Sequence, residues 1–346
     1  MRARVIRRDD ARPRSLAGLV LAREVVGDPA LPGFAKGHRI APGEVDALLA
    51  LPWEEISTIE METDDVYEDE AGARLARAAA GDGCAVGTPA GGHWPIVTTR
   101  RGVLDVRVEA LRDCNEREGI CVYTLYAGRI VDAGETVARA KITPFAIDGA
   151  TVRAVEERAA AAAGLVCVRP FVPRRVGAVV QETLGAKAMG RFREALAEKV
   201  AWFGSELLEP AFAPPGEDSI AAALRALADR GAAVLIVAGT KAMDVLDPAF
   251  RALAQLGAPL ERHGVPAHPG SLFWLAHLGT VPVLGMPSCG LFSQATVFDL
   301  VLPRVLAGER VGRSELAELG HGGMLTRELA FRFPPYRAAR PRGELE

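Results

Sequence analysis

Two polar loops in the second half of the chain combine lysine and aspartate side chains in a way that suits phosphate chemistry. The chain has only five lysines, and Lys187 and Lys241 each lie in such a loop. Either ammonium could add a point charge toward a phosphate, or it could be an ordinary solvated surface amine. Asp244 and Asp247 stand three residues apart in the second loop. One of them could hold Mg²⁺ through water while the other caps a helix, or both could only cap and turn the chain.

Two further side chains could do chemistry, and each has a plainer alternative. His268 precedes Pro269 and Gly270. It could hydrogen-bond a phosphate oxygen, whereas a loop histidine is more often solvated. Cys289 follows an apolar run at a strand-to-helix turn, where a thiolate is favoured. Because no histidine is placed by spacing to assist Cys289, we favour a buried small residue over a nucleophile.

These residues fall between the elements of a repeated strand, loop and helix pattern. Uninterrupted apolar runs predict buried strands at residues 176–180, 233–238 and 281–285. Amphipathic stretches predict helices at residues 190–203, 220–230 and 293–305. Asp247 followed by Pro248 predicts the start of one more helix. This order indicates an open parallel sheet that is covered by helices on both faces.

Ligands of such sheets bind beyond the carboxyl ends of the strands. Three loops should meet at that edge, at residues 181–187, 239–247 and 287–290. Their small residues leave room, and the backbone N–H groups at helix starts favour an anion. The sequence therefore predicts an anion site at the carboxyl edge of the sheet.

The first half of the chain mixes short β-rich runs with short helices. Helices are predicted at residues 42–51, 66–80 and 154–163, and strands at residues 56–60, 94–99, 102–106, 120–126 and 136–142. Pro170 and Pro173 then disfavour continuation of a helix. We therefore divide the chain into a mixed α+β, β-rich N-terminal domain at residues 1–170, an α/β domain at residues 171–330 and a C-terminal tail at residues 331–346.

Composition excludes several classes of protein. Of the 346 residues, 49% are hydrophobic and 25% are charged, which excludes a disordered or fibrous chain. The 41 basic and 44 acidic side chains nearly cancel, so general nucleic-acid binding is not expected. Prolines and glycines interrupt the longest uncharged stretch, so no membrane segment is expected. Five scattered cysteines without a C-x₂-C pair indicate a reducing, cytoplasmic location.

Three segments together resemble the molybdopterin-binding domain that molybdopterin adenylyltransferases and molybdopterin molybdenumtransferases share. They are residues 239–248 (GTKAMDVLDP), 263–271 (HGVPAHPGS) and 281–290 (VPVLGMPSCG). Residues 298–308 and 320–325, together with 36–40, 66–76, 134–138 and 142–144, are similar to a stand-alone bacterial subgroup of molybdopterin-binding proteins. The resemblance spans residues 16–325.

The resemblance implies a three-layer α/β domain with an open, mostly parallel sheet. Its loops would bind the dithiolene pterin, its phosphate and Mg²⁺ late in molybdenum cofactor assembly. The implied metal and catalytic residues are Asp244 and Asp247. The residues that match the family's cofactor loops, or would complete them, are Gly239, Thr240, Lys241, His268, Pro269, Gly270, Ser271, Pro287, Ser288, Cys289 and Lys187.

The chain also departs from the family pattern. The family's G-G-x-S-x-G-D is reduced to one glycine followed by Thr240 and Lys241, and its T-G-D/N-E stands here as QETL at residues 181–184. Bulkier side chains at glycine positions restrict the approach of the backbone to a phosphate. This favours a module that binds the pterin phosphate in cofactor biosynthesis or carriage. The alternatives are a Mg²⁺-dependent molybdenumtransferase or adenylyltransferase, and a nucleotide hydrolase of the competence-damage-protein type.

A homodimer is expected from the N-terminal domain. Its short elements supply little core, and Lys36 and His38 have no obvious ligand in their own half, although His38 could also be structural. In the molybdenumtransferases that the chain resembles, an elongated dimer brings N-terminal segments of one subunit toward the pterin loops of the other. Apolar residues around Trp53, Trp94 and Phe145 would then be buried against a second chain.

Overall fold

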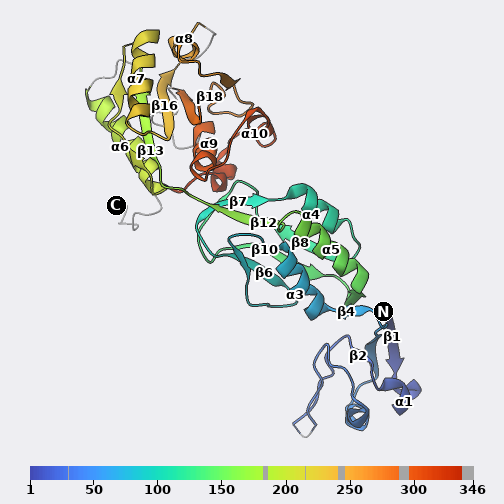
Figure 1. Ribbon diagram of the computed structural model, residues 1–346. Helices are drawn as coiled ribbons and strands as arrows, with labels where there is room; N and C mark the ends of the chain where they lie inside the picture. The colour runs from blue at the N-terminus through green and yellow to red at the C-terminus, as the bar shows by residue number, and fades with distance from the viewer. Residues whose placement is uncertain (30, 182–185, 215, 241–245, 288–295, 337–346) are drawn as a thin grey trace. The chain divides into compact units, whose positions relative to one another are not determined.

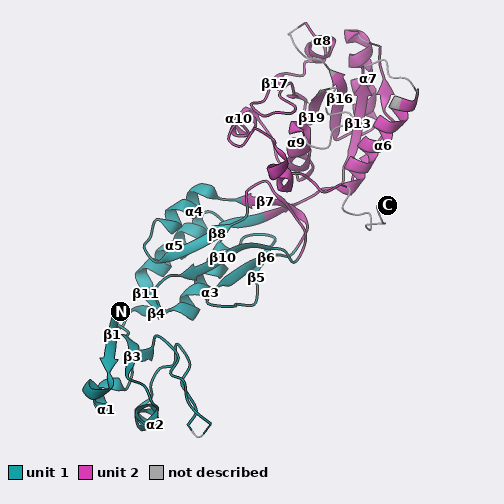
Figure 2. Cartoon of the chain, turned by 180° about the vertical axis from the view of Figure 1, so that it is seen from behind, with its two compact units in different colours: residues 1–99, 106–125, 134–167 teal, residues 100–105, 126–133, 168–346 magenta. Residues whose placement is uncertain are grey.

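Helices and strands are interspersed along the chain in the computed structural model, which describes residues 1–346 except 30, 182–185, 215, 241–245, 288–295 and 337–346 (Figure 1). They form two compact units (Figure 2). Unit 1 comprises residues 1–99, 106–125 and 134–167, and unit 2 comprises residues 100–105, 126–133 and 168–346. The combination of helices with several sheets is that of an α/β protein, as the sequence predicts. Among the described residues, no helix is both long enough and apolar enough to cross a membrane.

The N-terminal part of unit 1 is a small antiparallel sheet with two short helices. Its strands lie in the order β1 (Arg2–Arg7), β3 (Glu55–Glu60) and β2 (Val20–Leu21), and its helices are α1 (Pro13–Leu16) and α2 (Val45–Ala50), with 3₁₀ turns at Arg8–Asp10 and Pro42–Glu44. Leu16, Leu48 and Trp53 belong to its buried core. The Trp53 indole N–H donates to the Leu48 carbonyl at 2.7 Å. The expectation that Trp53 needs a second chain for burial is therefore wrong.

The rest of unit 1 is built on a four-stranded antiparallel sheet. Its strands lie in the order β5 (Cys84–Val86), β6 (Trp94–Thr98), β10 (Thr136–Ile142) and β8 (Ile120–Thr124). The helices are α3 (Glu68–Ala79), α4 (Val108–Asn115) and α5 (Gly149–Ala161), while β4 (Asp65–Tyr67) pairs with β11 (Ala146–Asp148). Arg74 of α3 donates two hydrogen bonds to Glu156 of α5, at 2.8 and 2.7 Å, which joins the two helices. A further sheet, most of whose residues belong to unit 2, has the order β12 (Val166–Pro170), β7 (Gly102–Val106) and β9 (Ile130–Val131).

Unit 2 contains a seven-stranded, mostly parallel sheet. Its strands are β13 (Arg175–Val180), β14 (Glu206–Leu207), β15 (Ala211–Phe212), β16 (Val234–Thr240), β17 (Leu260–His263), β18 (Trp274–Leu278) and β19 (Val281–Pro287). They lie in the order β14-β13-β16-β19-β18-β17, with β15 also paired to β13. The pairs β13·β16 and β16·β19 are parallel, whereas β18 runs antiparallel to both β17 and β19. The helices are α6 (Ala186–Trp202), α7 (Glu217–Asp229), α8 (Pro248–Gln255), α9 (Val297–Leu306) and α10 (Arg313–Glu318), with a 3₁₀ helix at Arg327–Arg332.

Both faces of this sheet are covered, because neighbouring residues of its central strands enter different cores. On β13, Val176, Ala178 and Val180 join a core that includes residues of α6 and α9. Val179, between them, joins a second core with residues of α7 and α8. An apolar run without polar interruption is the pattern expected of such a doubly covered strand.

A buried ion pair joins α6 to α9 in the first of these cores. The Lys199 ammonium donates to Asp299 Oδ1 at 2.7 Å, and the two residues are 8% and 0% exposed. Asp299 Oδ2 accepts hydrogen bonds from the Thr296 N–H and hydroxyl, each at 3.2 Å, and so caps the start of α9. Tyr336 is also buried in this core. Its burial and the nearby charge of Asp299 raise the pKa of its hydroxyl well above the ordinary value.

Several element boundaries differ from the sequence prediction. The helix predicted at residues 66–80 begins only at Glu68, because Asp65–Tyr67 pair with β11 instead. The helix predicted from residue 190 is already present at Ala186, and α9 begins at Val297 rather than at residue 293. The hairpin of β17 and β18 was not predicted at all.

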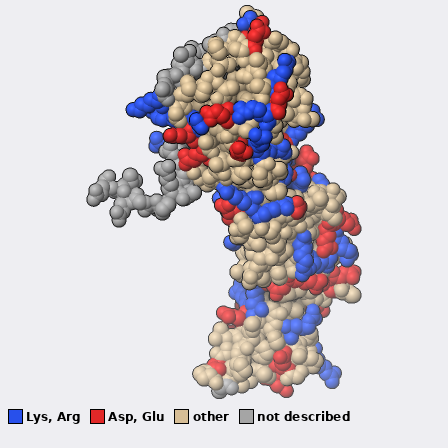
Figure 3. Space-filling view, turned by 60° about the vertical axis from the view of Figure 1, so that its left-hand side comes forward, with Lys and Arg blue, Asp and Glu red and all other residues tan. Residues whose placement is uncertain are grey.

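Charge is distributed without separation of sign on the face drawn in Figure 3, where the acidic and basic side chains of the described residues are interspersed. This agrees with the net charge of −3 and gives that face no strong single-sign field.

Candidate functional site

The three central parallel strands of unit 2 end side by side. Val180 of β13 pairs with Ala238 of β16, and Thr240 of β16 pairs with Pro287 of β19. Directly after β13, the Gln181 N–H donates to the Ala238 carbonyl at 3.2 Å. The loops predicted to carry chemistry therefore leave from adjacent strand ends.

A fourth loop reaches the same edge because β18 runs antiparallel to β19. Trp274, the first residue of β18, pairs with Gly285 near the end of β19, and His263, the last residue of β17, pairs with Trp274. The turn between β17 and β18, at residues 264–273, must therefore lie at the carboxyl edge of the sheet. This turn carries Pro269, Gly270 and Ser271, three residues of the predicted site.

Gly270 holds this turn against the start of α9. Its φ of +106° lies in the left-handed region, and a Cβ added to it would lie 2.9 Å from the Val297 nitrogen. The Val297 N–H donates to the Pro269 carbonyl at 3.1 Å, and the Val265 N–H donates to the Ser271 carbonyl at 2.9 Å. Only glycine fits here without displacing the backbone of α9.

His268 has a fixed backbone and an exposed side chain. Its N–H donates to the Gly323 carbonyl at 2.7 Å, and its carbonyl accepts from the Leu325 N–H at 2.8 Å. These bonds tie the 264–273 turn to residues 323–325, a segment that the sequence resemblance also includes. The imidazole stands at the surface, as either of its two predicted roles would require.

The described part of the predicted glycine turn, Gly239 and Thr240, forms the end of β16. Gly239 is buried with φ +83°, and the pairing of β16 with β19 shifts register between Ala238 and Thr240. A residue with positive φ at such a bulge changes the direction of the chain at the end of the strand. Thr240 is the last residue of β16, while Lys241 and Asp244 lie outside the described residues.

Asp247 is the N-cap of α8, which begins at Pro248 as predicted. Its Oδ1 accepts from the Ala249 N–H at 2.9 Å. Of the two roles weighed for the loop aspartates, capping is the one that the geometry of Asp247 displays. Within the described part of the chain, no three His, Cys, Asp or Glu side chains are grouped so that they could hold a metal ion.

The remaining predicted residues are Lys187, Pro287, Ser288 and Cys289. Lys187 is exposed on the first turn of α6 and is therefore a helix residue, not a loop residue as predicted. Pro287 is the last residue of β19. Ser288 and Cys289 lie outside the described residues.

In the sequence, Gln181 is only the first residue of a predicted loop and of the QETL segment that stands where the family has T-G-D/N-E. Its side chain is 8% exposed, and Oε1 has no hydrogen-bond partner in the part of the chain that the structure describes. Burying a carbonyl oxygen that accepts no hydrogen bond costs free energy. This atom can therefore accept a hydrogen bond from a ligand. The only signal in the sequence is a polar residue placed directly after a buried apolar strand.

The loop residues Lys36 and His38 of unit 1 have partners within that unit. The Lys36 ammonium lies 2.9 Å from Glu68 Oε1 and 4.7 Å from the centre of the Phe145 ring. His38 Nε2 is 2.7 Å from Glu44 Oε2. The premise that these two residues lack a ligand in their own half is therefore wrong.

Comparison with known proteins gives only weak similarities. No family model matches the chain, and no curated protein matches it. One similar solved structure is the molybdopterin biosynthesis MoeA protein from Pyrococcus horikosii, with 11% identity, a TM-score of 0.31, and coverage of 89% of this chain and 75% of that one. Another is a putative molybdenum cofactor biosynthesis protein from Corynebacterium diphtheriae, with 17% identity, a TM-score of 0.27, and coverage of 38% of this chain and 93% of that one. Both TM-scores are too low to establish a shared fold.

Proposed function

We propose that the chain binds molybdopterin, a pterin phosphate, at the carboxyl edge of the unit 2 sheet, and that it serves molybdenum cofactor biosynthesis or carriage. The observation that carries the proposal is the β17–β18 hairpin. It turns the 264–273 loop to the edge at which Gly239 and Pro287 lie. The three segments that carry the family resemblance are separate in the sequence, but all of them thus reach the same edge of the sheet.

The two ends of the ligand call for different partners. A phosphate suits backbone N–H groups and the ammonium groups of Lys187 and Lys241. The pterin ring carries N–H donors, so the unpaired Oε1 of Gln181 suits the ring and not the phosphate. His268 and Ser271 are both exposed on the 264–273 turn. They would contact the end of the ligand, pterin ring or phosphate, that faces this turn.

For Mg²⁺ we assign Asp244 as the first ligand and Asp247 as the second. Asp247 already caps α8, so any metal contact from it must be compatible with the hydrogen bond to Ala249. When bound, Mg²⁺ would neutralise phosphate charge. We favour binding over group transfer, because the single Gly239 offers less close backbone approach than a run of glycines.

Fluorescence titration with purified molybdopterin, with and without Mg²⁺, tests the proposal. We expect saturable binding that Gly270→Ala abolishes, because the new methyl group would displace the start of α9. Gly257→Ala is the matched control, since Gly257 also has positive φ but has nothing within 4 Å of the added methyl group. Gln181→Met should weaken binding and leave the fold intact. No binding to the wild-type chain at high micromolar molybdopterin would refute the proposal.

Reconstitution of a molybdoenzyme apoprotein separates carriage from catalysis. Asp247→Asn preserves a good N-cap and removes the charge. An unchanged yield of active molybdoenzyme supports carriage, whereas loss of stimulation supports a transferase.

A homodimer remains part of the proposal, now without support from Lys36 and His38. Light scattering coupled to size exclusion tests it at micromolar concentration. A mass near the 36.7 kDa of one chain would refute the dimer.

A further inference from the structure

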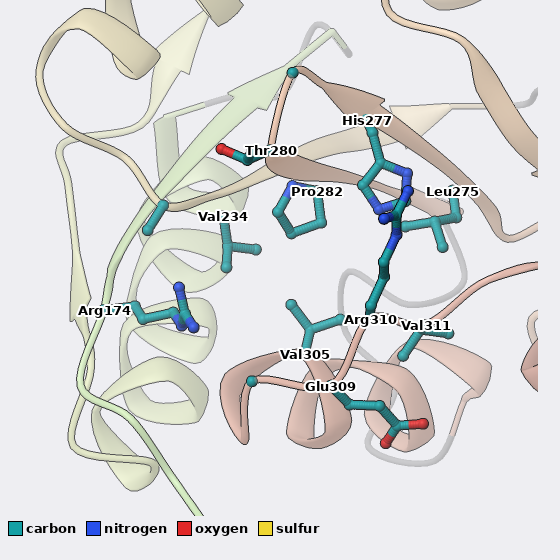
Figure 4. Close-up of a pocket in the computed structure, with 13 residues that line it drawn as sticks. Arg174, Val234, Leu275, His277, Thr280, Pro282, Val305, Glu309, Arg310 and Val311 are labelled. Atoms are coloured by element: carbon teal, nitrogen blue, oxygen red, sulfur yellow. The ribbon is translucent and has the colours of Figure 1, made fainter.

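A cavity lies at the opposite edge of the unit 2 sheet, where β13, β16 and β19 begin (Figure 4). Its volume is about 260 Å³, and all the residues that line it belong to unit 2. None of the described residues of the candidate pterin site lines this cavity. Any ligand here would therefore be a second one.

The floor of the cavity is apolar. Val234, Leu275 and Val305 line it, and all three are buried members of the core between the sheet and α9. An apolar cavity of roughly 150 Å³ accommodates benzene. The volume of this cavity therefore suits one ring, or a branched chain of similar size, together with a small polar group.

Two arginines enter the cavity from different elements. Figure 4 shows the Arg174 guanidinium directed inward from the strand side, and Arg310 rising from the segment after α9 toward His277. Arg174 Nε is buried and has no hydrogen-bond partner among the described residues. A buried N–H of a charged group without an acceptor is costly, and an oxyanion would supply that acceptor.

Of the acidic side chains nearby, Glu309 is held by other cations, and Glu261 does not line the cavity. Both Glu309 oxygens accept from Arg304 Nε at 3.0 Å, and Arg169 approaches Glu309 Oε2 to 2.8 Å. In Figure 4 the Glu309 carboxylate is turned away from the cavity. Glu261 Oε1 accepts from the Arg313 N–H at 3.3 Å. The charge that faces the cavity is therefore positive.

His277 adds a neutral polar group to the wall. Burial lowers its pKa, Glu261 at 3.9 Å partly opposes this, and the charge of Arg310 lowers the pKa again. At neutral pH the imidazole is therefore uncharged and offers one N–H donor and one acceptor. Thr280, in the turn between β18 and β19, adds a hydroxyl.

We propose that this cavity binds a small organic oxyanion, a carboxylate or a phosphate monoester on a compact apolar group. Arg174 and Arg310 hold the oxyanion, and Val234, Leu275 and Val305 contact the apolar group. Inorganic phosphate alone leaves the floor empty, and a neutral ring alone leaves Arg174 Nε unpaired. Both parts of the ligand are therefore required.

Calorimetric titration of the full chain at neutral pH uses four probes: phenyl phosphate, benzoate, inorganic phosphate and phenol. We expect phenyl phosphate or benzoate to bind once per chain, and inorganic phosphate and phenol to bind at least about tenfold more weakly. Tighter binding of phenyl phosphate identifies a phosphate monoester as the natural ligand class, and tighter binding of benzoate identifies a carboxylate. Equal affinity for inorganic phosphate would mean an adventitious ion only and would overturn the proposal, as would no saturable binding of either aryl anion.

Three arginine variants locate the bound probe. Arg174→Gln and Arg310→Gln should each weaken the better aryl anion at least about fivefold. Arg225→Gln is the matched control, because Arg225 is exposed on α7 and does not line the cavity. Arg310 is exposed, so its variant keeps the test valid even if Arg174→Gln does not fold. Unchanged affinity in Arg310→Gln, or an equal loss in Arg225→Gln, would overturn the assignment to this cavity.

Discussion

Replacing Lys199 by methionine should destabilise unit 2 more than any other single lysine substitution among the described residues. The methionine side chain has nearly the same length, so the change removes the charge and leaves most of the packing. Lys199 is the one described lysine that is buried, and its partner Asp299 is fully buried. The variant therefore leaves a buried carboxylate without its cation.

The magnitude follows from the geometry of the pair. At the 2.7 Å separation of Lys199 Nζ and Asp299 Oδ1, an effective dielectric constant of about 20 gives an attraction of about 6 kcal/mol. Desolvation of the two charges offsets much of this attraction. Removal of one partner from a buried pair costs about 3–5 kcal/mol, because the other charge stays buried. A typical domain has about 5–15 kcal/mol of stability in total, so the loss is large.

Urea unfolding followed by tryptophan fluorescence measures this loss. The Trp202 ring lies 5.7 Å from that of Tyr336, which covers the ion pair, so its emission reports on this core. Hydrogen exchange across α6 and α9 would localise the change to unit 2. Lys187→Met is the matched control: it is the same substitution on the same helix at an exposed position, and it should cost less than about 0.5 kcal/mol.

The double variant Lys199→Met with Asp299→Asn distinguishes a stranded charge from lost packing. If the unpaired carboxylate is the cause, the double variant should be more stable than Lys199→Met alone. A double variant of equal or lower stability, or a cost for Lys199→Met no larger than that of Lys187→Met, would refute the reasoning.

Three other measurements test separate parts of the molecule. Gly270→Ala should lower the free energy of unfolding by about 1–3 kcal/mol beyond Gly257→Ala, and equal losses would contradict the contact with α9. Asp247→Ala should cost about 1 kcal/mol through the lost cap, whereas Asp247→Asn should cost little, as thermal unfolding would show. Burial alone would raise the pKa of Glu309, but Arg304 and Arg169 lower it below the ordinary value. The ionised Glu309 therefore stabilises the fold fully above about pH 5, and this stabilisation is lost as the pH falls below the ordinary carboxyl pKa. In Glu309→Gln, the free energy of unfolding should therefore fall less steeply on the acid side than in the wild type.

Local patterns predicted the elements whose causes are local. The apolar runs at residues 176–180 and 281–285 are strands because they are buried on both faces, and Asp247 with Pro248 begins a helix as its cap chemistry requires. The hairpin was missed because β17 is an edge strand with charged residues in the middle, and its pairing depends on β18, which stands after a ten-residue turn. The β4 strand was missed because pairing with β11, far along the chain, overrides the helical pattern at Asp65–Tyr67.

The candidate site shows the same division. Gly239 and the cap at Asp247 follow from their neighbours in sequence. The unpaired Oε1 of Gln181 and the contact of Gly270 with Val297 depend on elements that only the fold brings together. The sequence predicts which loops lie at the edge of the sheet. Which buried polar atoms lack partners there depends on how the chain packs, and only the structure identifies them.

The buried ion pair and the candidate site meet at the start of α9. Asp299 caps this helix through Thr296 and is itself held by Lys199, while Val297, between them, donates to the Pro269 carbonyl of the 264–273 turn. The position of that turn therefore depends on a helix start that a buried charge fixes. Loss of the buried pair would therefore disturb this helix start and, through the hydrogen bond from Val297 to Pro269, the turn as well.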